Sequence, residues 1–292
     1  MRCVVLLCLV LLAGCQSLPQ LPAWQSPEGL EHADLGVIRD LRSGEQLTPQ
    51  QLIERLAKAP RVLVGEQHDN PDHHALQLWL LQALAEQRTQ GSLLLEMLNP
   101  DQQIRVEQVQ AAMAGGESVS DLPSALAWQR NWDWAMYGPI LRYALAQPYP
   151  VLSANLDRSE IMRIYAARPV LSGTASTAAV VRTPLLAQIR DSHCGQLPEN
   201  QLPAMLAVQQ QRDRRMAERL LDAPEPAILF AGAFHVRRDL GVPLHLADLG
   251  AAPDSLVLIL AEVGKPVAVE AADFVWYSAA QPEQDHCAKL RN

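Results

Sequence analysis

Two histidines of this chain follow the same short pattern, in which an apolar run is followed by a glycine and, three residues later, by a histidine. The first copy contains Gly65 and His68, and the second contains Gly232 and His235. Short apolar runs bounded by polar residues are typical of strands buried on both faces of a parallel sheet. Because open α/β sheets bind ligands at the carboxyl ends of their strands, we expect both histidines at one functional edge.

Three more polar side chains close or follow predicted strands, namely Glu66, Glu96 and Asn155. One interpretation is a zinc or manganese site with His68, Glu96 and His235 as ligands, in which the remaining carboxylate acts as a general base. The alternative is that each polar group only caps a strand or the helix after it. The histidines at 73 and 74 follow directly, and we interpret them as the solvent-exposed start of a helix.

Aromatic residues make up only 5% of the chain, yet Trp132, Trp134 and Tyr137 fall within six residues. This segment predicts a core cluster, a membrane-proximal surface or a flat apolar wall for a planar ligand. In the last case Tyr137 would offer a phenolate, a group that ligates ferric haem iron in catalase.

The elements that must position these residues alternate between strand and helix. Strand signals occur near 37–41, 45–47, 61–64, 92–96, 151–155, 227–231, 255–260 and 274–277. Helical signals occur near 48–58, from 70 onward, and at 101–113, 121–129 and 139–147. This alternation predicts an α/β fold with a largely parallel β-sheet flanked by helices.

The segment 157–222 lacks a strand signal, apart from an ambiguous apolar stretch at 178–181. It predicts a smaller all-helical subdomain, inserted into an α/β domain formed by residues 34–156 and 223–292. The length of 292 residues, 49% of them hydrophobic, is ample for such a core.

The first residues resemble a bacterial lipoprotein signal, with one arginine, a short apolar stretch and small residues before Cys15. We expect a signal peptide at 1–14, lipidation of Cys15 and a lipidated tether over 15–33. Gln16 follows the cysteine, so the resemblance implies anchoring in the outer membrane, on its periplasmic or surface face. The formal charge of −8 argues against nucleic acid as a partner. Cys194 and Cys287 remain, and whether they pair is open.

Several of these features together, in this order, resemble the ChaN family of bacterial iron-regulated haem-binding lipoproteins. They are the two glycine–histidine motifs, Trp132-Asp133-Trp134 with Tyr137, Ser153-Ala154-Asn155, His193-Cys194, Arg212-Asp213 and the segment 232–244. The matches run from about residue 61 to 246. The wider Tiki, TraB and erythromycin-esterase-like superfamily includes metal-dependent peptidases and esterases, which keeps a divalent-metal-dependent hydrolase open as the alternative.

The resemblance implies a haem carrier that takes part in haem or iron acquisition, rather than an enzyme. It implies haem held by a tyrosine, with Tyr137 as the first candidate and Tyr165 as the reserve, in a pocket completed by a homodimer that haem induces. His193 and Arg212 or Arg215 are the candidates for contacts with the propionates. The expected pocket edge consists of Glu66, His68, Glu96, Trp132, Trp134, Asn155 and His235. An outer-membrane haem receptor is the expected partner.

Overall fold

The computed structural model describes residues 18–285 and 287–288. The predicted signal peptide and the lipidation site Cys15 lie outside the described residues. No helix in the described part of the chain is both long and apolar enough to cross a membrane.

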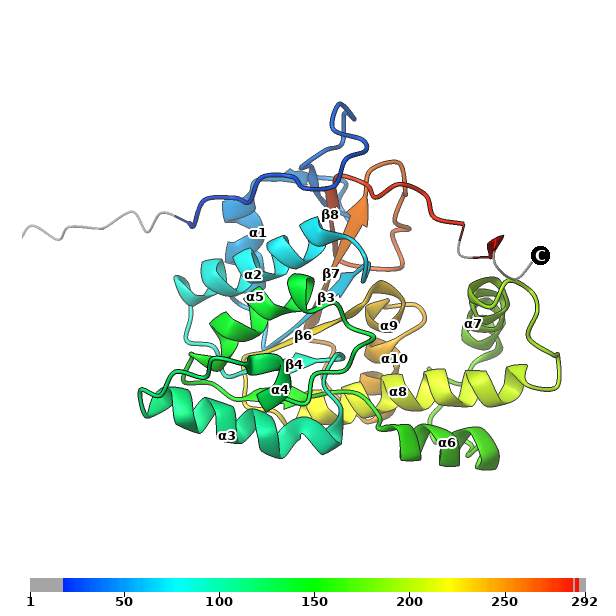
Figure 1. Ribbon diagram of the computed structural model, residues 1–292. Coiled ribbons are helices and arrows are strands. Elements are labelled where there is room, and N and C mark those ends of the chain that lie inside the picture. Colours follow the sequence, from blue (N-terminus) through cyan, green and yellow to red (C-terminus); the bar gives the residue numbers. More distant parts are fainter. Residues whose placement is uncertain (1–17, 286, 289–292) are drawn as a thin grey trace, which may run out of the picture.

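The core of the protein is an eight-stranded sheet (Figure 1). In spatial order its strands are β2 (Gln46–Leu47), β1 (Ile38–Asp40), β8 (Phe274–Ser278), β7 (Ser255–Glu262), β3 (Arg61–Glu66), β6 (Ala227–Gly232), β4 (Ser92–Leu95) and β5 (Val151–Ser153). Every pairing from β8 to β5 is parallel, and β1 runs antiparallel to both of its neighbours. The predicted α/β fold with a largely parallel sheet is confirmed.

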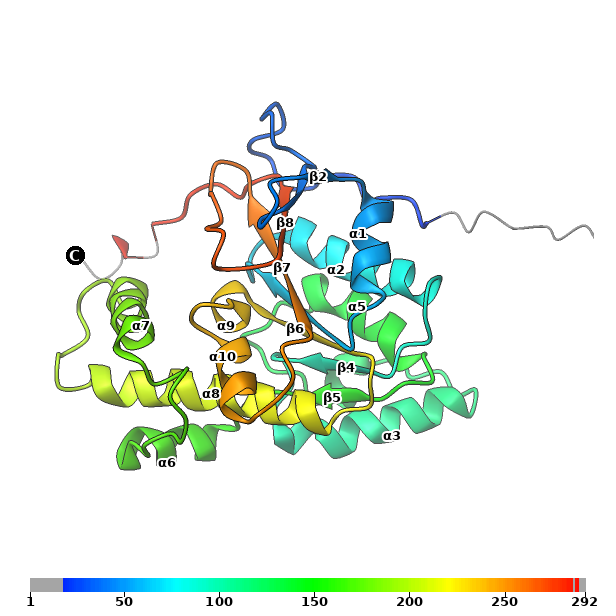
Figure 2. The same cartoon turned by 180° about the vertical axis from the view of Figure 1, so that it is seen from behind.

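Helices cover both faces of the sheet, and others extend beyond it. The helices are α1 (Pro49–Leu56), α2 (Pro71–Ala85), α3 (Gln103–Ala114), α4 (Leu122–Ala125), α5 (Trp134–Leu145), α6 (Arg158–Ala167), α7 (Ala179–Ser192), α8 (Leu202–Asp222), α9 (Ala233–Val236) and α10 (Val242–Asp248), with a 3₁₀ turn at Pro100–Gln102. Helices α1, α2, α3 and α5 pack on one face, and α8 and α10 pack on the other (Figures 1 and 2).

The interior positions of the central strands are apolar because they are buried on both sides. Val62 and Val64 of β3 point into the core beneath α1, α2 and α5, whereas Leu63 points into the core beneath α8 and α10. Successive side chains of a strand face opposite ways, so each strand needs apolar residues at odd and even positions alike.

Three predicted elements differ in the structure. The helix predicted at 121–129 is confined to the four residues of α4. Helix α5 begins at Trp134, five residues before Pro139, because the Asp133 side chain caps it by accepting a hydrogen bond from the Ala135 N–H at 2.8 Å. Pro139 is therefore an internal residue of that helix and not its start. The ambiguous stretch at 178–181 enters α7 and forms no strand.

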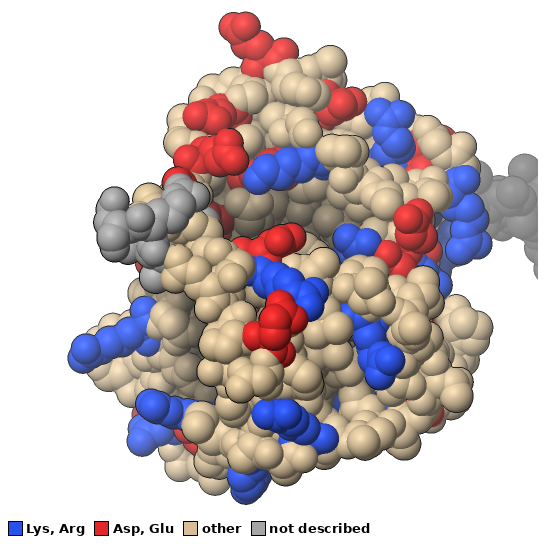
Figure 3. All heavy atoms as spheres, turned by 90° about the vertical axis from the view of Figure 1, so that its right-hand side faces the viewer, with Lys and Arg blue, Asp and Glu red and all other residues tan. Residues whose placement is uncertain are grey.

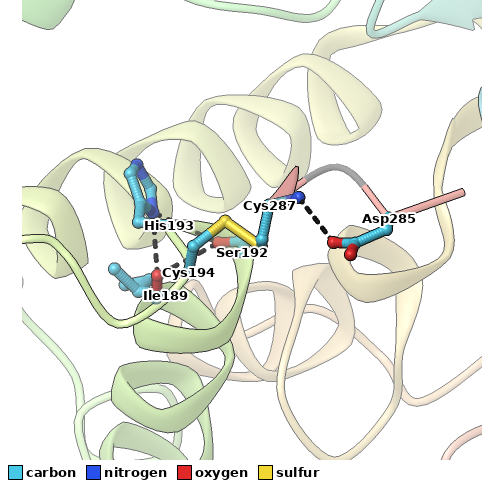
Figure 4. Close-up of a disulfide and its surroundings, with 6 residues drawn as sticks. All are labelled: Ile189, Ser192, His193, Cys194, Asp285 and Cys287. Carbon is cyan, nitrogen blue, oxygen red and sulfur yellow. Dashed lines mark hydrogen bonds between the residues drawn. A yellow bond between two sulfur atoms is a disulfide. The ribbon is translucent and has the colours of Figure 1, made fainter. Parts of the chain in front are cut away.

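The segment 157–222 contains α6, α7 and α8. Helices α7 and α8 share a small core of their own, and the later part of α8 packs onto the sheet through Met216, Ala217 and Leu220. A disulfide joins Cys194, just after α7, to Cys287 in the C-terminal segment (Figure 4). This bond links the helical segment to the end of the chain across 93 residues of sequence.

The described part of the predicted tether is packed against the domain. We call residues 18–36 the N-terminal strap. The Asp72 carboxylate at the start of α2 accepts hydrogen bonds from the backbone N–H groups of Gln25 and Ser26, at 2.7 and 3.0 Å. Trp79 donates its indole N–H to the Pro19 carbonyl at 2.9 Å.

Candidate functional site

The carboxyl ends of β3, β6, β4 and β5 lie side by side and carry the polar residues singled out in the sequence. His68 follows β3, His235 lies in α9 after β6, Glu96 follows β4 and Asn155 follows β5. All four line a cavity of about 350 Å³, together with Trp132, Leu156, Arg158, Ile161, Arg212 and side-chain amides. The structure thus brings the two histidines of the repeated motif into one site.

His235 is buried between two carboxylates. Its Nδ1 is hydrogen-bonded to Asp213 of α8, and its Nε2 lies 3.3 Å from Oε1 of Glu96. Burial alone would lower the pKa of His235, but the charges of Glu96 and Asp213 outweigh it and raise the pKa to about 10. His235 is therefore an imidazolium at neutral pH, and neither ring nitrogen is free to accept a proton or bind a ligand.

Glu96 lies beside both histidines. Its second carboxylate oxygen accepts a hydrogen bond from the Gly232 N–H at 2.8 Å. Burial alone would raise the pKa of Glu96, but the charge and hydrogen bond of His235 and the charge of His68 hold it well below its usual range. Glu96 therefore stays ionised, as a fixed negative charge at the base of the cavity.

His68 differs from His235 because one of its nitrogens is free. Its Nδ1 lies 2.6 Å from Oε1 of Glu66, and its side chain is 44% exposed. Burial lowers the pKa of His68, but the hydrogen bond and charge of Glu66 and the charge of Glu96 raise it above the ordinary value. No described residue forms a hydrogen bond with Nε2, which is therefore the nitrogen available to a ligand.

Tyr137 is buried beneath this edge. Its hydroxyl donates a hydrogen bond to Glu66 at 3.1 Å and lies 3.3 Å from Nδ1 of His68. Burial, followed by the charge and hydrogen bond of Glu66, raises the pKa of Tyr137 far above its ordinary value. Tyr137 is not among the residues that line the cavity. In this arrangement it supports the Glu66–His68 pair as a neutral hydrogen-bond donor.

His73 and His74 are buried, which corrects their interpretation as a solvent-exposed helix start. The Nδ1 of His73 accepts a hydrogen bond from the Gln67 N–H at 2.9 Å. The Nε2 of His74 lies 3.1 Å from the His68 carbonyl, and its ring packs on Tyr137 with centroids 4.3 Å apart. Both histidines therefore hold the backbone of the loop that presents His68.

The remaining candidates fall in different places. Trp132 meets the His68 ring edge-on with centroids 4.8 Å apart, whereas Trp134 packs on Trp128 outside the cavity. Asn155 donates its side-chain N–H to the Glu96 carbonyl at 2.8 Å. Tyr165 is half-buried on α6, one turn after the cavity residue Ile161.

The three propionate candidates are also separated. Arg212 lines the cavity, and its buried Nε has no hydrogen-bond partner among the described residues. Arg215 is paired with Glu160 at 2.7 Å and borders a neighbouring hollow of about 420 Å³. His193 lies after α7, where its ring contacts the Ile189 carbonyl at 2.8 Å, and it does not line the cavity (Figure 4).

Asp213 and Arg158 were missed as site residues in the sequence. A signal for Asp213 existed, since it falls on the stripe of α8 formed by buried residues such as Leu206, Gln210, Ala217 and Leu220. A carboxylate on such a stripe must have a buried partner. Arg158 begins α6 and carries no comparable signal.

No group of three or more His, Cys, Asp or Glu side chains in the described part of the chain is arranged to hold a metal ion. The zinc and manganese alternative with His68, Glu96 and His235 therefore has no support. The physical reason is that carboxylates already occupy both nitrogens of His235. On the face shown in Figure 3, basic and acidic side chains are interspersed around a hollow and form no continuous patch of one sign.

The fold and site define an α/β protein in which two histidines, each paired with a carboxylate, lie at the carboxyl edge of the sheet. A cavity lies between this edge and a helical segment. Comparison with known families identifies it further: the chain belongs to the family described as "Haem-binding uptake, Tiki superfamily, ChaN", whose model matches residues 52–246.

Among solved structures, the chain is similar to ChaN of Campylobacter jejuni, a structure titled for its cofacial haem binding. The two are 29% identical, the match covers 82% of this chain and 95% of that one, and the TM-score is 0.76. A mutant of the erythromycin esterase EreC is 14% identical, with 87% and 85% of the chains covered and a TM-score of 0.45. No curated relative matches the chain.

Proposed function

We propose that this protein is a haem-binding lipoprotein, anchored in the outer membrane through Cys15, that takes part in haem and iron acquisition. Membership of the haem-binding family supports the ligand. The signal-like sequence that ends at Cys15 supports the anchor and the location.

The observation that carries the haem proposal is the cavity that joins the sheet edge to α6 and α8. Three of its wall residues, Trp132, Leu156 and Ile161, offer apolar surface for a porphyrin. Two others, Arg158 and Arg212, offer guanidinium groups. Haem has this mixed character, an apolar macrocycle with two carboxylates. Arg212 suits a propionate because its buried Nε lacks a protein partner and guanidinium pairs well with carboxylate.

For the iron ligand, accessibility favours Tyr165 over Tyr137. Tyr165 is half-buried and lies one helical turn from Ile161, so both are on the same side of α6. Tyr137 would have to give up its hydrogen bond to Glu66 and ionise beside that carboxylate. Both tyrosines stay under test, because their roles come from the family resemblance.

A second copy of the chain is proposed to close the pocket over haem. Helix α6 supports this because none of its residues is buried, although Met162 is a large apolar residue with 59% exposure. His193 and Arg215 would then contact the propionates held by the other copy. An outer-membrane haem receptor is the proposed exchange partner.

A haemin titration followed by absorption spectroscopy tests the proposal. The wild-type chain in detergent should show a saturable spectral change, and sedimentation should show a mass increase with haem occupancy. Tyr165→Phe should alter the spectrum of the bound haem, whereas Tyr137→Phe should leave that spectrum unchanged. A wild-type titration without saturation would reject haem binding, and an unaltered Tyr165→Phe spectrum would reject this ligand.

A further inference from the structure

The path from the proposed lipid to the folded domain is short. The N-terminal strap packs against the domain from its first residues. Leu18 contacts the core cluster between the sheet and α1, α2 and α5, and the Pro19 carbonyl accepts the indole N–H of Trp79 at 2.9 Å. Two residues separate Leu18 from Cys15. Because an extended chain spans at most about 3.6 Å per residue, a lipid on Cys15 would hold Leu18 within about 11 Å of the bilayer surface.

The strap adds no length to this path unless its contacts break. The Asp72 carboxylate accepts hydrogen bonds from the backbone N–H groups of Gln25 and Ser26, and the Ser26 side chain is buried. Further along, Glu28 pairs with Ala280, just after β8. The strap is therefore a part of the domain, and a lipid on Cys15 would attach one particular side of a folded body to the bilayer.

The strap begins on the side of the domain opposite the helical segment. In Figures 1 and 2 it starts beside α1 and α2, whereas α6 and α7 lie at the other end of the molecule. The cavity belongs to that other end, because its lining residues follow the carboxyl ends of the parallel strands or come from α6 and α8. Figure 3 views the molecule from this end and shows a hollowed face.

The size of the domain limits how far it can tilt. A domain of this length has a radius of gyration of about 18 Å and is roughly 45–50 Å across. When one point on the surface of such a body is kept within about 11 Å of a plane, the body tilts by about 60° at most before it meets that plane. The side opposite the attachment point therefore stays about 35 Å or more from the bilayer.

We infer that the anchored protein lies with the strap side of α1 and α2 against the lipid surface, and that its cavity opens away from the bilayer. The inference rests on the proposed lipidation of Cys15. Near the start of the strap, Leu21 is an apolar side chain with 42% exposure. Among the described residues, α1, α2 and α5 carry no large apolar side chain of comparable exposure. The lipid and the strap thus make the bilayer contact, and these helices lie above it without insertion.

This orientation determines which partners can exchange haem with the cavity. A surface embedded in the same bilayer is too far from the cavity to take up or deliver haem directly. The partner must present its own haem site about 35 Å above the bilayer. A receptor therefore has to reach the cavity with a segment that projects from the membrane.

Fluorescence energy transfer to acceptor lipids measures the height of each side above the bilayer. Leu21→Cys and Val180→Cys place a donor label on the strap and on α7, in each case at an exposed apolar position. Once the signal peptide is removed, the introduced cysteine is the only free thiol, because Cys194 and Cys287 form a disulfide and Cys15 carries the lipid. The lipidated chain is added to preformed vesicles of phosphatidylethanolamine and phosphatidylglycerol that contain an acceptor-labelled headgroup lipid.

Transfer from Leu21→Cys should be at least about three-fold more efficient than transfer from Val180→Cys. The path from Cys15 keeps Leu21 within about 22 Å of the bilayer, whereas α7 stays about 35 Å away. The matched control is a flexible Gly/Ser linker of about 20 residues inserted between Ser17 and Leu18, which extends the path by about 25 Å and leaves the strap contacts in place. This insertion should lower transfer from Leu21→Cys to the level of Val180→Cys.

Far-ultraviolet circular dichroism checks that each labelled chain folds. Ala23→Cys and Val170→Cys, both at exposed positions, replace either of the first two chains if it does not fold.

Equal transfer from the strap and from α7 in the lipidated chain, or stronger transfer from α7, would overturn the inferred orientation. Unchanged transfer in the linker variant would also overturn it, because the short path would then not be what holds the domain. An intact mass without lipid on Cys15 would reject the proposed anchor together with this inference. The haem proposal is tested separately by the haemin titration, which does not depend on the orientation.

Discussion

Asp213→Asn tests whether His235 is held as a buried cation. The substitution keeps the size of the side chain and removes its charge. A rise in the His235 pKa from 6.5 to about 10 corresponds to roughly 5 kcal/mol of stabilisation of the charged ring, shared by Glu96 and Asp213. Losing one of these two partners should therefore lower the free energy of unfolding by about 2–3 kcal/mol at pH 7.

The loss of stability in Asp213→Asn should depend on pH, because the contribution of His235 depends on its protonation. A group whose pKa is raised by folding stabilises the protein fully below its unfolded pKa and loses that contribution as pH rises through the folded value. The contribution of His235 is thus complete below pH 6.5 and almost absent above pH 10. The difference between wild type and Asp213→Asn should shrink over the same window.

Urea denaturation at pH 7 and at pH 10 measures the effect, with Asp222→Asn as the matched control on the exposed surface of the same helix. The control should change stability by about 0.5 kcal/mol or less at either pH. A loss in Asp213→Asn that is the same at both pH values would show that charge is not its origin. A loss no larger than that of the control would refute the buried ion pair itself.

Three further perturbations follow from the same contacts. Tyr137→Phe leaves Glu66 without its phenolic donor and should cost about 1–3 kcal/mol of unfolding free energy in urea denaturation, so unchanged stability would contradict the hydrogen bond. Replacing Cys194 and Cys287 together by serine should cost about 2–4 kcal/mol. Dithiothreitol should destabilise the wild type by the same amount and leave the double variant unaffected, and a reductant effect on that variant would point to another cause. Asp72→Ala should speed proteolysis within the N-terminal strap, since the strap loses two hydrogen bonds to that carboxylate, and an unchanged cleavage pattern would show that the strap is held elsewhere.

The sheet and its polar edge were predictable because their signals are local. A parallel strand buried on both faces needs an apolar interior, and the carboxyl ends of parallel strands lie at the same edge of the sheet. His68 and His235 could therefore be placed together from the two short apolar runs that precede them. The pairing of β3 with β6 then required only that the two runs be neighbours.

The partners of these histidines were harder to predict. Asp213 reaches His235 only because α8 packs beside β6, a contact that sequence spacing does not encode. Burial of His73 and His74 depends on where the first turn of α2 meets Ser278 and Tyr137, which are distant in sequence. The start of α5 at Trp134 was missed because the proline signal at Pro139 was given more weight than the Asp133 cap.

In the proposed complex, haem binds against the edge formed by His68 and His235. A titration of ring-labelled histidine NMR signals with ferric haemin tests this directly, because the paramagnetic iron broadens nearby resonances. The His68 and His235 signals should broaden with haem occupancy, while the signal of His32, on the N-terminal strap, should stay sharp. Saturable haem binding that leaves His68 and His235 sharp would contradict it.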